Sequence, residues 1–141
     1  MRRAVLLLAA LLVVSNPASG DDFRAYDIEI IFPWTRATTP GQDISQVYMK
    51  LSNTGDYADR LVRASSPMAK HVQLNPRTNL VIPPGETVML APDGPQLTLT
   101  GLTALLVEGQ SLPFTLTFER GGTVDVSALI TNADAMAPPS E

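Results

Sequence analysis

Soft metal ligands are the side chains of this sequence with the most distinctive chemistry, and there are few of them. The chain has one histidine, five methionines and no cysteine. Met68 and His71 stand close together along the chain, and a thioether and an imidazole so placed could hold Cu(I) in a two-coordinate site, because copper favours soft ligands. The other methionines beyond the first residue are Met49, Met89 and Met136.

Ordinary packing explains the same residues more simply. Met49 and Met89 occupy apolar positions of strand-like segments, so both are predicted to fill the core. Met68 follows a proline and is predicted to lie in a loop, packed over a sheet edge. His71 falls on the polar phase of a short strand and is predicted to be exposed. A single histidine with a single methionine would also bind copper far less tightly than four convergent ligands.

Enzyme signatures are missing from the sequence. A Ser-His-Asp arrangement would have to use His71, yet no Gly-x-Ser-x-Gly elbow is present. The sequence contains neither a Gly-rich phosphate loop nor a His-Glu-x-x-His motif. Without cysteine there is no disulfide scaffold and no thiolate metal site. The net charge of −4, with scattered Lys and Arg, argues against a nucleic-acid partner. The sequence predicts a non-enzymatic protein without a cofactor.

Two further groups of residues have a functional and a structural interpretation. Trp34 and Arg36 could form a surface recognition patch, but we prefer a structural role at one end of a barrel, with Arg36 stacked on an aromatic ring. Six acidic residues fall at turns and strand ends, without the spacing of a calcium loop, and are predicted to be solvated. They are Asp56, Asp59, Glu86, Asp93, Glu108 and Glu119.

The elements that position these residues are short strands with alternating apolar and polar side chains. Pro33–Arg36 is expected to end the first strand, and Asn53-Thr54-Gly55 to close the second in a turn that needs positive φ. About seven to nine strands with frequent turn signals, and no amphipathic helix, predict an all-β Greek-key β-sandwich in a single domain. We expect strands over 26–32, 46–52, 59–66, 71–74, 97–102, 112–118 and 124–130, two short strands within 80–90, and a crossover loop over 102–109.

The two ends of the sequence differ from the middle. Arg2 and Arg3, the apolar run Ala4–Val14 and the small residues Ala18–Gly20 predict a signal peptide over 1–20, cleaved after Gly20. The run is short for a bilayer span, so an uncleaved N-terminal anchor is the less favoured alternative, and no cysteine follows that could be lipidated. We therefore predict a periplasmic protein with a domain over 21–130. The Ala- and Pro-rich residues 131–141 are predicted to be a disordered tail.

Seven segments of the sequence, in order, match one known family. They are Pro33–Arg36, Tyr48–Gly55, Ala58–Pro67, Ile82–Val88, Leu99–Leu102, Leu106–Gly109 and Phe114–Gly122. Together they resemble the periplasmic copper chaperones called PCu(A)C, over roughly residues 26–130, nearly all of the predicted mature chain. The resemblance implies a cupredoxin-like β-sandwich that binds Cu(I) with two histidines and two methionines and helps to load copper into cytochrome c oxidase.

The copper ligands of that family do not carry over. Matched residue by residue, the first histidine falls at Asn75, its methionine near Arg77, and the His-x-Met pair at Gln96 and Thr98. All four positions are substituted, and the loop after Asn75 is shorter than in the family. If the framework is shared, Asn75 and Gln96 should lie on neighbouring loops at the same end of the sandwich and face a common point.

Three functions follow from this comparison of residues. The first is an exported, non-enzymatic PCu(A)C-like domain that has lost its copper site and acts by protein–protein contact. It would serve as an accessory subunit or assembly factor of a membrane-bound respiratory or metal-handling complex. The alternative is a periplasmic copper chaperone with a relocated, weak Cu(I) site near Met68 and His71. The third is a small-ligand binding module that uses the vacated pocket near Asn75, Gln96 and Thr98.

Overall fold

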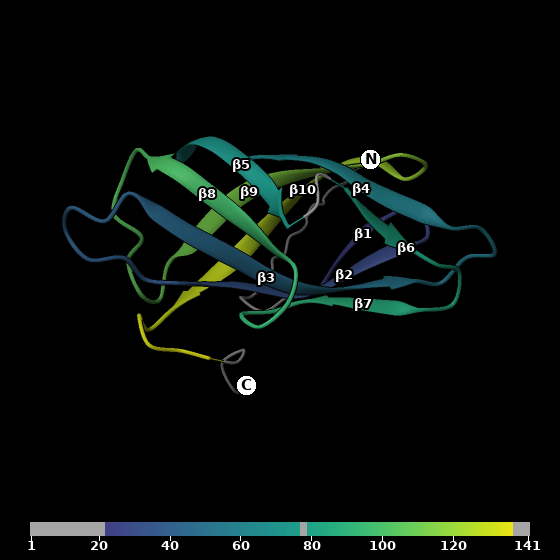
Figure 1. Cartoon of the computed structure of the whole chain (residues 1–141), viewed down its shortest axis with the longest axis horizontal. Coiled ribbons are helices and arrows are strands. Elements are labelled where there is room, and N and C mark those ends of the chain that lie inside the picture. The colour runs from purple at the N-terminus through teal and green to yellow at the C-terminus, as the bar shows by residue number, and fades with distance from the viewer. Residues whose placement is uncertain (1–21, 77–78, 137–141) are drawn as a thin grey trace, which may run out of the picture.

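The regular structure of the protein is built from β-strands. The computed structural model describes residues 22–76 and 79–136, and Figure 1 shows their arrangement. No helix within these ranges is long and apolar enough to cross a membrane. The strands are β1 (Phe23–Ala25), β2 (Ile28–Arg36), β3 (Ile44–Asn53), β4 (Asp59–Ser65), β5 (Ala69–Asn75), β6 (Leu80–Ile82), β7 (Thr87–Leu90), β8 (Gln96–Leu102), β9 (Ser111–Phe118) and β10 (Gly122–Thr131).

One continuous sheet forms both layers of the domain. Its order is β5-β8-β3-β2-β10-β9-β4-β6, with β1 added to β2 and β7 added to β3. The strand pairs are antiparallel apart from the parallel pairing of β10 with β2. The sheet curls, so that β5, β8 and β3 form a layer in front of β9 and β10 (Figure 1). The prediction of an all-β sandwich is confirmed.

The core lies between the two layers, where alternate side chains of each strand point inward. In β9 the buried residues are Leu112, Phe114, Leu116 and Phe118, with exposed or partly buried residues between them. The facing strand β8 contributes Leu97 and Leu99. This period of two is the pattern that predicted the strands.

The first long strand does not end at Pro33, and that prediction is wrong. β2 continues to Arg36, because a bulge inserts one extra residue between Ile31 and Trp34. Phe32, within the bulge, has a φ of 45°. A proline is tolerated at such a point because the bulge interrupts the ladder of hydrogen bonds. The bulge also divides β2 between two partners, with β1 before it and β10 after it.

The turn after β3 forms for a different reason from the one predicted. Gly55 does not have positive φ. A side chain at this position would instead overlap the Asp27 side chain, which would have to shift to make room. The buried Asn53 side chain organises the turn, because its Nδ2 donates to the carbonyl oxygens of Tyr57 at 2.8 Å and Ile82 at 2.9 Å.

The C-terminal boundary of the domain lies beyond the predicted residue 130. Thr131 is buried and is the last residue of β10. Arg36 then donates hydrogen bonds to the carbonyl oxygen of Ala135 and, at 3.3 Å, to the sulfur of Met136. Residues 131–136 therefore contact the domain. The predicted signal peptide over 1–20 and the final residues 137–141 lie outside the described residues, and the predictions for them stay open.

Asp59 is not a solvated surface charge, in contrast to the prediction. It is 5% exposed, and its carboxylate accepts hydrogen bonds from the backbone N–H groups of Arg60, Arg120 and Gly121 at 2.7–2.9 Å. This carboxylate ties the start of β4 to the turn between β9 and β10. The other five acidic residues of the predicted set are exposed, as expected.

Replacing Asp59 with alanine should destabilise the domain by about 2–3 kcal/mol, because the substitution removes the acceptor of three backbone N–H groups. Urea unfolding with an unchanged m-value would measure this loss. Asp56→Ala, at an exposed carboxylate, is the matched control and should change stability by less than about 0.5 kcal/mol. Equal stability of the two variants would contradict the role assigned to Asp59.

Candidate functional site

Three of the four residues that the resemblance matches to copper ligands, namely Asn75, Gln96 and Thr98, lie together, as predicted. Asn75 ends β5 and Gln96 begins β8, and the two are directly opposite in the antiparallel pairing of these strands. The Nδ2 of Asn75 donates to the hydroxyl oxygen of Thr98 at 2.6 Å. The positions are ends of paired strands rather than loops. Arg77 lies outside the described residues.

The amide nitrogens of this cluster already have hydrogen-bond partners. The Asn75 amide is bound to Thr98, and the Nε2 of Gln96 donates to the carbonyl oxygen of Gly94 at 3.3 Å. Amide and hydroxyl groups are hard ligands, poorly suited to Cu(I). Among the residues that the structure describes, no three His, Cys, Asp or Glu side chains gather closely enough to hold a metal ion. The cluster is suited to joining β5 to β8 by hydrogen bonds.

Met68 and His71, the alternative pair, differ in their surroundings. Met68 is partly buried and packs against the hydrophobic core. His71 is exposed on β5, on the face opposite to the inward-pointing Val72 and Leu74. The predictions of a packed Met68 and an exposed His71 are both confirmed.

The two methionines predicted to fill the core have different positions. Met49 is buried, as predicted, but Met89 is 52% exposed. Met89 pairs with Lys50 across β3 and β7, and directly opposed residues share one face of a sheet. Val88 and Leu90 supply the more buried positions of β7. The prediction for Met89 is wrong because adjacent apolar residues left the phase of this short strand undetermined.

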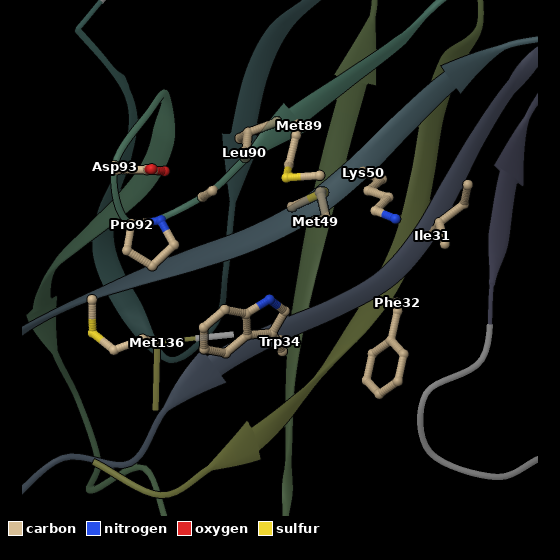
Figure 2. A pocket seen from close by; sticks show the side chains of 11 residues that line it. Ile31, Phe32, Trp34, Met49, Lys50, Met89, Leu90, Pro92, Asp93 and Met136 are labelled. Carbon is tan, nitrogen blue, oxygen red and sulfur yellow. The ribbon is translucent and has the colours of Figure 1, made fainter. Parts of the chain in front are cut away.

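Met89 borders a groove of about 620 Å³ on the outer side of the sheet. Residues from β2, β3 and β7, the segment after β7, and the end of the described chain surround it (Figure 2). Apolar side chains make up most of its lining. The lining residues are Ile31, Phe32, Trp34, Met49, Lys50, Met89, Leu90, Ala91, Pro92, Asp93 and Met136.

An aromatic stack supports this groove. The rings of Trp34 and Tyr48 lie 4.7 Å apart at 46°, and the guanidinium of Arg36 lies 5.4 Å from the Tyr48 ring centroid. Burial raises the pKa of Tyr48 above its ordinary value near 10, and the charge of Arg36 opposes this rise only in part. The predicted stacking of Arg36 is confirmed. Because Arg36 also binds Ala135 and Met136, the stack fixes one end of the groove.

Sequence comparison relates this chain to a family of cell-envelope proteins. Residues 28–130 match the family described as "Putative lipoprotein LpqE-like". A relative from Leifsonia xyli subsp. xyli (strain CTCB07), "Putative lipoprotein Lxx21020", is 30% identical over 139 residues, which cover 88% of this chain and 82% of the relative.

Comparison of structures relates this fold to PCuAC domains, some of which were solved with copper bound. The copper-bound PCuAC domain from PmoF2 has a TM-score of 0.76 at 29% identity, over 79% of this chain and 98% of that domain. The apo PCuAC domain from PmoF1 has a TM-score of 0.77 at 25% identity, over 79% of this chain and 99% of that domain. The Cu(I) form of DR1885 from Deinococcus radiodurans has a TM-score of 0.64 at 27% identity, over 73% of this chain and 77% of that protein. The PCu(A)C resemblance and the cupredoxin-like sandwich are confirmed.

Installing soft ligands at the paired strand ends should create a copper site. We expect the combination of Asn75→His, Gln96→His and Thr98→Met to raise Cu(I) affinity about a hundredfold or more, because three soft ligands would then converge from two fixed strands. Adding Arg77→Met should raise it further. Competition with a chromogenic Cu(I) chelator measures the affinity.

The single variant Asn75→His is the matched control and should gain little. A triple variant that keeps the far-ultraviolet spectrum and melting temperature of the wild type, yet binds Cu(I) no better than this control, would show that the paired strand ends are not a latent copper site.

Proposed function

This chain belongs to the LpqE-like family, and we propose that it is an exported, non-enzymatic PCuAC-like domain that has lost its copper site and acts by protein–protein contact. The observation that carries the proposal is the cluster of Asn75, Gln96 and Thr98, in which Asn75 stands opposite Gln96 and donates a hydrogen bond to Thr98. It stands where the resemblance to PCu(A)C chaperones implies copper ligands. The framework is retained, whereas the chemistry of the site has changed from soft donors to amide and hydroxyl groups.

Export is supported by the relatives and by the N-terminal sequence. The matching family and the Leifsonia relative are described as lipoproteins, and residues 1–20 have the pattern of a signal peptide. The 141 residues contain no cysteine, so none of them can carry the thioether-linked lipid of a lipoprotein. A periplasmic location, with the signal peptide removed, is the form of export that we propose.

The proposed partner is a protein of a membrane-bound respiratory or metal-handling complex. Two of the similar structures contain copper according to their names, and copper delivery requires contact between proteins. A domain that keeps the scaffold without the metal site can keep the contact surface. In that role it would be an accessory subunit or assembly factor of such a complex.

The other two hypotheses receive less support from the geometry. A relocated copper site would need Met68, whose side chain is packed against the core. A small-ligand site at the vacated position would have few free donors, because the Asn75 amide donates to Thr98 and the Gln96 amide donates to Gly94.

Titration with Cu(I) against a chromogenic competitor tests the proposal. The protein from Asp21 onward should bind no stoichiometric copper, because its ligand positions hold hard donors. The double variant Met68→Ala with His71→Ala should behave like the wild type. Binding of one equivalent that survives the competitor would contradict the proposal. Loss of that binding in the double variant would place the site at Met68 and His71.

A further inference from the structure

The groove beside Trp34 has the size and lining of a small-molecule site. Its volume of about 620 Å³ falls within the range of about 300–1,000 Å³ that is typical of ligand pockets. Met89 is 52% exposed over it, whereas Trp34, at 3%, is almost entirely covered. The groove therefore offers a ligand mainly the flexible thioether of Met89, which can adapt to an apolar chain, with only the edge of Trp34 accessible.

The charged residues of the groove stand apart from each other. Lys50 lies at the end formed by Ile31 and Phe32, and Asp93 lies at the opposite end, near Met136 (Figure 2). Within 22–76 and 79–136, no carboxylate lies within 4.0 Å of the Lys50 ammonium group. An anionic group would be attracted to the Lys50 end and repelled from the Asp93 end.

We propose that this groove binds a medium-chain fatty acid. The carboxylate lies at Lys50, and the alkyl chain runs across Trp34 toward Met136. A single cation beside an apolar groove matches a ligand with one negative charge and one chain. Figure 2 shows Trp34 between the Lys50 end and Met136, beside the path of the alkyl chain.

The tail and the segment after β7 complete the site at its far end. Met136 is held there by its sulfur contact with Arg36 at 3.3 Å, and Pro92 forms the facing wall. Burial of an alkyl chain between these side chains supplies the affinity, at about 25 cal/mol for each Å² of apolar surface removed from water. Lys50 and Asp93 then set the direction in which the chain lies.

The chain carries its own reporter, because Trp34 is its only tryptophan. Dodecanoate with bromine at the methyl end quenches indole fluorescence on contact, so it should quench Trp34 saturably below its micellar concentration. Lys50→Glu should weaken binding about tenfold or more, since it replaces an attractive charge with a repulsive one. Lys70→Glu, at an exposed lysine on β5, is the matched control and should leave binding unchanged.

A second variant separates ligand binding from folding. Met89→Asp changes an exposed side chain, so it should keep the wild-type melting temperature and abolish quenching. Absence of saturable quenching in the folded wild-type protein would overturn the proposal. Equal affinity of the wild type and Lys50→Glu would overturn it too, as would equal binding of bromododecanol, which lacks the charge. None of these results depends on whether copper binds at Asn75 and Gln96.

Discussion

The register of β5 against β8 is the constraint on which the functional account depends. It sets Asn75 opposite Gln96 and brings Thr98 within hydrogen-bond distance of Asn75. Because side chains alternate along a strand, a shift of one residue would turn this cluster to the other face of the sheet. Leu74 and Leu97 point into the core beside it and hold the register in place. The same register would let histidine and methionine side chains converge on a metal.

The bulge in β2 has a comparable effect on the outer side of the sheet. It lets one strand pair first with β1 and then with β10, and it places Trp34 against Tyr48. Arg36 stacks on that ring and binds the chain after β10. The groove thus depends on residues that are distant in sequence. The domain has two separate surfaces of interest, a polar strand pair and an apolar groove.

Local alternation made much of this fold predictable. The pattern over 112–118 and 97–102 identified both strands and their buried faces, and the PCu(A)C resemblance placed Asn75 beside Gln96. Features that depend on pairing between distant strands could not be predicted. The exposure of Met89 follows from its position opposite Lys50, and the burial of Asp59 follows from the approach of the β9–β10 turn. The groove forms only where β2, β3, β7 and the residues after β10 come together, and these segments are spread along much of the sequence.

Nuclear magnetic resonance of the isotopically labelled protein with one equivalent of Cu(I) would test the central claim most directly. The claim is that Asn75, Gln96 and Thr98, on the paired strands β5 and β8, do not form a metal site. We predict that the side-chain amide signals of Asn75 and Gln96 and the backbone signals of β5 and β8 stay unchanged when copper is added. A selective shift or loss of those signals at equimolar copper would contradict the account.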